Sequence, residues 1–149
     1  MPVDPSFVGR VYPPTEPYEV SREKIREFAE AIGDANPVYR SRAAAQELGH
    51  QDVIAPPTFA IVVTMRASRQ IIEDPDLGID YSRVVHGEQR FVHARSLRAG
   101  DLLQVVVSVE NIRAAAGNDM VTSKAEVSTV EGELVCTAFS TLVARGTAA

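Results

Sequence analysis

The residues best suited to support chemistry lie in one short segment, Gly33-Asp-Ala-Asn-Pro-Val-Tyr39. Asp34 follows a glycine that ends a predicted helix, and a carboxylate in such a place can handle a proton near neutral pH. It can equally be a turn residue that hydrogen-bonds the local backbone, and Asn36 before Pro37 has the same two interpretations. Tyr39 is a poor base at neutral pH because the pKa of a tyrosine is about 10. We therefore centre any chemistry of this chain on this segment.

Other candidates lie in Val53-Ile-Ala-Pro-Pro-Thr-Phe59 and Val85-His-Gly-Glu-Gln-Arg-Phe91. The candidate residues are Pro56, Pro57, Thr58, His86 and Gln89. Pro57 has no N–H and so donates no backbone hydrogen bond. His86 and Gln89 are candidates for ligand contact, and a histidine satisfied within a strand is the alternative. Gly87 between them predicts a bulge or the close approach of another backbone. The three histidines have no spacing with carboxylates that indicates a metal site.

Three helices are predicted to position these segments. Ser21 is a favourable N-cap for a first helix that ends at Gly33. A short second helix is expected over 41–48. The stretch from Thr58 to Glu73 contains neither glycine nor proline, and its first half is apolar on nearly every face. Such a pattern predicts a helix that is buried on most sides.

The second half of the chain changes to the two-residue period of strands. Apolar residues alternate with polar ones over 103–109, and further alternating runs cover 121–127 and 135–143. The expected alternating sets are Leu103, Val105, Val107 and Val109; Val121, Ser123, Ala125 and Val127; and Val135, Thr137, Phe139, Thr141 and Val143. Turn residues separate the runs, so we predict an antiparallel meander with one buried face. One buried helix and one such sheet predict an α+β fold in which a curved sheet wraps around a central helix.

Length and composition narrow the class of protein. The 149 residues suit a single domain spanning 1–149, in which the proline-rich residues 1–17 lie extended over the surface. A net charge of −5, with no tryptophan, argues against nucleic-acid binding. Cys136 is the only cysteine, which excludes an internal disulfide and favours a small buried hydrophobe over a nucleophile. The sequence shows no signal peptide and no apolar run that could span a membrane, so the cytoplasm is expected.

The motifs together resemble the MaoC-like branch of hot-dog proteins, the (R)-specific enoyl hydratases and 3-hydroxyacyl dehydratases. The resemblance runs from about Tyr18 to Arg145 and rests on the segments above and on Phe91-Val-His-Ala-Arg-Ser-Leu-Arg-Ala-Gly-Asp101. It implies a single hot-dog fold. The chain is most similar to small actinobacterial dehydratase subunits that act with a partner on 3-hydroxyacyl carrier protein.

Active members of this family carry Asp-x-Asn-Pro-x-His, and an Ala-His-Gly motif at the start of the central helix. The aspartate and histidine handle a water molecule and a proton, and the glycine N–H donates to the thioester carbonyl. Asp34, Asn36 and Pro37 match the first motif, whereas Tyr39 stands in place of the histidine. Pro56 and Pro57 stand in place of His-Gly. The resemblance therefore implies a frame for dehydratase chemistry without its base and its backbone donor.

Three functions remain open at this point. The leading one is a subunit of an (R)-3-hydroxyacyl-thioester dehydratase of fatty-acid metabolism that binds the acyl chain, while a histidine-containing hot-dog partner supplies the missing groups. The second is a self-sufficient homodimer in which Asp34 acts with another residue such as His86. The third is a non-catalytic protein that binds acyl thioesters, with Tyr39 either lining an acyl tunnel or simply packing. The substrate is an acyl-CoA or acyl-carrier-protein thioester, and no cofactor or metal is expected.

Overall fold

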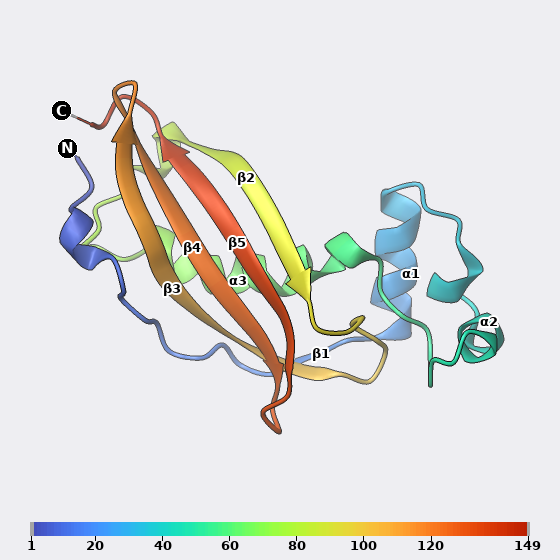
Figure 1. The fold of residues 1–149 in the computed structure, drawn as a ribbon. Helices are drawn as coiled ribbons and strands as arrows, with labels where there is room; N and C mark the ends of the chain where they lie inside the picture. Colours follow the sequence, from blue (N-terminus) through green and yellow to red (C-terminus); the bar gives the residue numbers. More distant parts are fainter. Residues whose placement is uncertain (1, 149) are drawn as a thin grey trace.

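In the computed structural model, which describes residues 2–148, one five-stranded antiparallel sheet curves along a single long helix (Figure 1). The strands are β1 (Tyr18–Glu19), β2 (Val84–His93), β3 (Leu102–Ala115), β4 (Asn118–Thr129) and β5 (Leu134–Ala144). Their order across the sheet is β1-β3-β4-β5-β2. The long helix α3 (Ala60–Ile72) packs on the concave face, while α1 (Arg22–Ala31) and α2 (Arg42–Glu47) lie beyond one end of the sheet (Figure 1). The predicted α+β architecture is confirmed.

The three helices form where local signals predict them. The Ser21 hydroxyl caps α1 by accepting a hydrogen bond from the Lys24 N–H at 3.1 Å, and Ser41 caps α2 through the Ala44 N–H at 3.1 Å. Gly33 ends the first helix with φ of +74°, a conformation that favours glycine. The predicted third helix begins with a 3₁₀ turn, η3 (Pro57–Phe59), and continues as α3 to Ile72. Proline fits this first turn because its missing N–H has no partner there in any helix.

The burial of α3 differs from the prediction in one respect. One side of the helix is buried, as expected, through Ala60, Val63, Thr64, Ala67 and Ile71. The opposite side is open, and Met65 is 65% exposed. The prediction of a helix buried on most sides is therefore wrong for the single chain.

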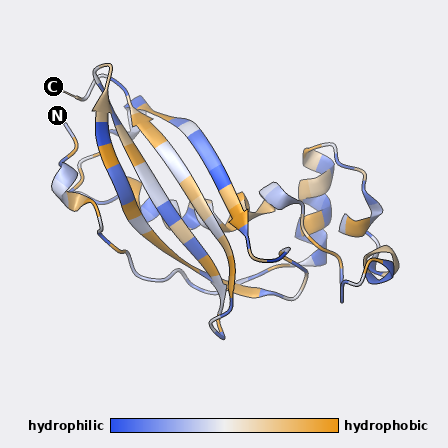
Figure 2. Cartoon of the chain, in the orientation of Figure 1, coloured by the Kyte–Doolittle hydropathy of each residue, from blue (hydrophilic) through white to orange (hydrophobic). Residues whose placement is uncertain are grey.

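The sheet confirms the predicted alternation on β3 and β4. Leu103, Val105, Val107 and Val109 are buried on β3, and Val121, Ser123, Ala125 and Val127 are buried on β4. Figure 2 shows the same alternation of apolar and polar segments along these two strands. In contrast, β2 is mostly hydrophilic in that view.

The predicted inward set of β5 is wrong. Register with β4 pairs Ala125 with Ala138 and Val127 with Cys136, so the inward residues are Cys136, Ala138, Ser140 and Leu142. Of the predicted set, Thr137, Phe139, Thr141 and Val143 lie on the other face. Val135, at the register shift, is fully buried, and Thr141 is 8% exposed. Both sets contain apolar residues, so periodicity alone does not fix which face is inside. Cys136 itself is fully buried, and burial raises the pKa of its thiol to about 11, which confirms its prediction as a buried hydrophobe.

The two edges of the sheet differ. The N-terminal segment runs extended along the outer edge of β3, apart from the short 3₁₀ turn η1 (Pro5–Phe7). Its bonds to β3 include Gly9 N–H to Val109 O at 2.8 Å and Tyr12 N–H to Val107 O at 2.9 Å. Within residues 2–148, no strand pairs with the outer edge of β2. The sheet therefore has one covered edge and one open edge.

The open strand β2 contains the predicted bulge. Its register with β5 shifts between His86 and Glu88, and a Cβ on Gly87 would lie 2.9 Å from Val143 Cγ2. The predicted bulge is confirmed. The close neighbour of Gly87 is the side chain of Val143 rather than another backbone. The bulge leaves Gln89, Phe91 and His93 on the face of β2 that turns toward α3.

The two chain ends are tied together by Asp119, which is 3% exposed on β4. Its Oδ2 accepts hydrogen bonds from the Val3 N–H at 3.1 Å and the Thr147 hydroxyl at 2.5 Å. We expect Asp119→Ala to lower the free energy of unfolding by about 2 kcal/mol, because both donors then lose a charged acceptor in a buried place. Urea denaturation measures this change. Asp119→Asn keeps one acceptor oxygen and is expected to lose less stability than Asp119→Ala. An alanine variant as stable as wild type would contradict the assignment.

Candidate functional site

The carboxylate and amide of the 33–39 segment are engaged with local backbone. Asp34 Oδ1 accepts a hydrogen bond from the Asn36 N–H at 3.0 Å. Asn36 Oδ1 accepts one from the Val38 N–H at 3.1 Å and so caps the 3₁₀ turn η2 (Pro37–Tyr39). Both side chains therefore act as turn residues, which was one of the two interpretations of each. The turn holds Tyr39 in the position where it becomes buried.

Tyr39 lies in a small cavity of about 210 Å³, here called the motif pocket. The residues that line it are Tyr39, Ile54, Ala55, Pro57, His93, Ser96 and Leu97. Burial and the negative charge of Asp34 raise the pKa of Tyr39, which is 8% exposed. The phenol therefore keeps its proton at neutral pH and is not available as a base.

Two prolines precede α3 at this pocket, and one of them lines it. Pro56 is buried, whereas Pro57, which lines the pocket, and Thr58 are exposed. The Pro57 carbonyl lies 2.8 Å from His93 Nε2. Because a carbonyl only accepts, the histidine donates from Nε2. Pro57 has no N–H to donate, and its carbonyl is engaged by His93.

His93 joins the site although the sequence did not single it out. It stands at the end of β2, and its Nδ1 is buried without a hydrogen-bond partner among the described residues. The signal in the sequence was weak, because one histidine in a strand is more often structural than functional. Its place follows only once β2 is known to run past the start of α3.

His86 and Gln89, also on β2, lie in a second cavity of about 180 Å³ between this strand and the helix, here called the α3–β2 pocket. The residues that line it are Ile61, Thr64, Met65, Ser68, Ile72, Tyr81, Val84, His86, Gln89, Ser140 and Leu142. His86 Nε2 lies 3.0 Å from the Glu88 carbonyl and 3.2 Å from the Ser140 hydroxyl. The cavity is mainly apolar, with a few polar groups, which is the usual character of a small-molecule site.

The structure thus divides the predicted site residues into two groups. Tyr39 and Pro57 line the motif pocket, whereas His86 and Gln89 line the α3–β2 pocket. Figure 1 places the turn after α1 beyond one end of the sheet and the start of β2 near the other end. Within one chain, Asp34 and His86 are therefore not neighbours, and a catalytic pair of the two has no geometric support there.

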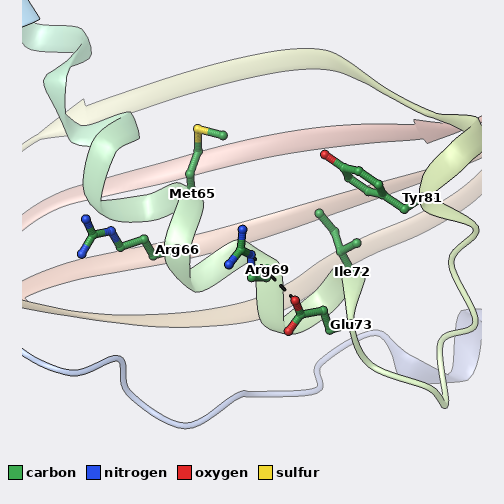
Figure 3. Close-up of a pocket in the computed structure, with 6 residues that line it drawn as sticks. All are labelled: Met65, Arg66, Arg69, Ile72, Glu73 and Tyr81. Carbon is green, nitrogen blue, oxygen red and sulfur yellow. Dashed lines mark ion pairs between the residues drawn. The ribbon is translucent and has the colours of Figure 1, made fainter.

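The open face of α3 adjoins the α3–β2 pocket. Figure 3 shows Met65, Arg66 and Arg69 projecting from the helix, with Tyr81 across from them. They surround a depression of about 600 Å³, which shares Met65, Ile72 and Tyr81 with the α3–β2 pocket. Met65 is 65% exposed and Tyr81 is 69% exposed. An exposed apolar face beside an open strand edge is typical of a protein–protein contact.

The charges on this face are largely paired with neighbours. The Arg69 guanidinium lies 3.7 Å from the Glu73 carboxylate, and Arg66 stacks over the Tyr18 ring at 5.0 Å (Figure 3). Among residues 2–148, no three histidine, cysteine or acidic side chains gather as metal ligands. None of the helices described there has the length and apolar character that crossing a membrane requires.

Comparison with known families gives a match over most of the chain. Residues 6–138 match the model for the FAS1-like dehydratase domain region. A UPF0336 protein of Saccharopolyspora erythraea is 64% identical over 148 residues, covering 99% of this chain and 95% of that protein. Another from Thermobifida fusca is 50% identical over 148 residues, covering 99% and 97%.

Solved structures agree with the sequence matches. A MaoC-like dehydratase superposes with a TM-score of 0.87 at 35% identity, and this chain covers 42% of that longer protein. The HadBC (3R-hydroxyacyl-ACP dehydratase) complex of Mycobacterium tuberculosis gives a TM-score of 0.82 at 31% identity. There the match covers 92% of this chain and 96% of the other. The two matches cover 94% and 92% of this chain.

Proposed function

This chain belongs to the MaoC-like hot-dog family of dehydratases and hydratases, and from this premise we propose that it is the acyl-binding subunit of a heteromeric (R)-3-hydroxyacyl-thioester dehydratase. A hot-dog partner supplies the aspartate–histidine pair and the glycine N–H. The substrate is an acyl-CoA or acyl-carrier-protein thioester, and the reaction belongs to fatty-acid metabolism. The cytoplasm is part of the proposal, because these thioesters are intracellular metabolites.

The observation that carries this proposal is the chemistry of the motif pocket. Dehydration needs a group that takes the α-proton and a group that protonates the departing hydroxyl. Tyr39 keeps its own proton at neutral pH, and Asp34 is held in a turn by the Asn36 N–H. Pro57 lines the pocket but has no N–H, and losing one such donor costs about 2.7–4 kcal/mol of transition-state stabilisation. The motif pocket of this chain is therefore poorly equipped to catalyse the reaction alone.

The α3–β2 pocket supports the acyl-binding part of the proposal. Most of its wall area is apolar, and it lies between α3 and the open strand β2. A partner placed on this face would bring its own catalytic groups toward the pocket. The volume of about 180 Å³ equals that of about six water molecules, which is room for a short stretch of alkyl chain.

The relatives give independent support for a two-chain enzyme. The HadBC protein is described as a complex, and it is 31% identical to this chain over nearly its full length. Pairing through the β2 edge would satisfy backbone groups that no strand of this chain satisfies. Heteromeric assembly is thus consistent with both the comparison and the free edge.

A direct test compares the chain alone with the chain co-purified with a hot-dog protein that retains Asp-x-Asn-Pro-x-His, encoded by a neighbouring gene. Hydration of a trans-2-enoyl-CoA is followed by loss of enoyl absorbance. We expect turnover only in the complex, with little effect of Tyr39→Phe or Asp34→Asn in this chain. Full activity of the chain alone, abolished by Asp34→Asn, would instead establish a self-sufficient homodimer. Thermal stabilisation by acyl-CoA without turnover in either preparation would indicate a binding protein.

A further inference from the structure

The side-chain amide of Gln89 is an anomaly in this fold. Both its Oε1 and its Nε2 are buried, and neither has a hydrogen-bond partner within residues 2–148. The only other such atom among the described residues is His93 Nδ1. Buried polar groups are almost always hydrogen-bonded, so an amide with both ends unpaired calls for a physical explanation.

The polar neighbours of Gln89 do not form hydrogen bonds with its amide. Ser140 is its register partner on β5, but the Ser140 hydroxyl lies 3.2 Å from His86 Nε2 and is engaged there. Thr64 and Ser68 line the same α3–β2 pocket from the helix, and neither bonds to the amide. An apolar side chain of the same length would avoid this penalty. The unpaired amide is therefore a cost to the isolated chain, and such costs are typical of functional sites.

The chemistry of the amide restricts what can satisfy it. It offers one acceptor oxygen and one donor NH₂ group. A thioester carbonyl only accepts and would leave Oε1 unpaired, while an alkyl chain would satisfy neither atom. A hydroxyl group or a water molecule both donates and accepts, so it can pair with both ends of the amide.

We propose that Gln89 is a substrate-binding residue that holds the β-hydroxyl of the 3-hydroxyacyl thioester, and the water that this hydroxyl becomes. This inference rests on the proposed function, in which the acyl chain lies in the α3–β2 pocket and the partner's catalytic groups face that pocket. In dehydration the partner's base takes the α-proton, the bond between the β-carbon and oxygen breaks, and the partner's acid protonates the leaving hydroxyl to give water. Gln89 neither gives nor takes a proton and only positions the oxygen.

The test uses Gln89→Met, which keeps the length of the side chain and removes both polar atoms. Gln104→Met is the matched control, because the Gln104 amide is paired with the Thr15 carbonyl at 3.2 Å and lies outside both pockets. In the isolated chain, Gln89→Met is expected to raise the melting temperature by about 2–4 °C, and Gln104→Met is not. An unchanged or lower melting temperature for Gln89→Met would overturn the claim that the amide is unpaired.

In the complex with the partner, Gln89→Met is expected to lower kcat for dehydration by about 10- to 100-fold. The inhibition constant of a saturated acyl-CoA, which has no β-oxygen, is expected to stay within about threefold, because only contacts to that oxygen are lost. Gln104→Met is expected to leave both values at the wild-type level. Unchanged kcat, or equal weakening of saturated and hydroxylated ligands, would overturn the assignment.

Two further outcomes distinguish a failure of this inference from a failure of the proposed function. If the Gln89→Met complex falls apart on size-exclusion chromatography, the amide is satisfied by the partner chain, and the inference is wrong while the proposed function stands. If the wild-type complex forms but shows no turnover, the proposed function fails, and this inference fails with it.

Discussion

Replacing Asp101 by alanine is expected to lower the free energy of unfolding by about 3 kcal/mol, because it removes a buried carboxylate that accepts three hydrogen bonds, two of them from the Arg95 guanidinium. The Asp101 side chain is 6% exposed, and its two oxygens accept hydrogen bonds from Arg95 Nη1 and Nη2, each at 2.9 Å. The same carboxylate accepts the Arg98 N–H at 2.9 Å. This arrangement fixes the connection between β2 and β3, which contributes Ser96 and Leu97 to the motif pocket.

Urea denaturation of three proteins tests this prediction. Glu133→Gln is the control, because Glu133 bonds the same arginine at 3.1 Å but is 57% exposed, and exposed pairs contribute about 0–1 kcal/mol. Asp101→Asn keeps the shape of the side chain and is expected to fall between the two. Equal losses for Asp101→Ala and Glu133→Gln would show that burial does not strengthen this pair.

Features set by a few neighbouring residues were predictable from the sequence. Ser21, Ser41 and Gly33 act through hydrogen bonds and backbone angles within one turn, and the helices begin and end where these residues predict. The bulge at Gly87 follows from the same kind of local rule. These signals need no knowledge of the rest of the fold.

Features set by packing between distant segments were not predictable. The inward face of β5 depends on its register with β4, and both of its faces carry apolar residues. The open side of α3 has an apolar pattern like that of a buried helix. Apolar residues are favoured at a protein–protein contact for the same reason as in a core, so the sequence pattern does not distinguish the two. His93 entered the site through the Pro57 carbonyl, 36 positions away in the chain, which no spacing rule indicates. The division of the candidates between two pockets has the same origin.

Phe59 stands directly before α3 and packs against α1, the helix that precedes the 33–39 turn. Its side chain is fully buried, and its ring meets Phe28 of α1 edge-on, with 5.4 Å between the ring centroids. Phe59→Ala is expected to lower the free energy of unfolding by about 3–5 kcal/mol, because it removes a large buried side chain and leaves a cavity.

The pair also allows a sharper measurement. Phe28→Ala alone is expected to cost less, because Phe28 is only partly buried. A double-mutant cycle on Phe28 and Phe59 isolates the contact between the rings, for which about 0.5–1.5 kcal/mol is expected beyond area burial. Strict additivity of the two losses would mean that α1 and the start of α3 are held together by other contacts. A coupling in the expected range would identify this aromatic pair as the contact through which the fold keeps the 33–39 turn against Pro57.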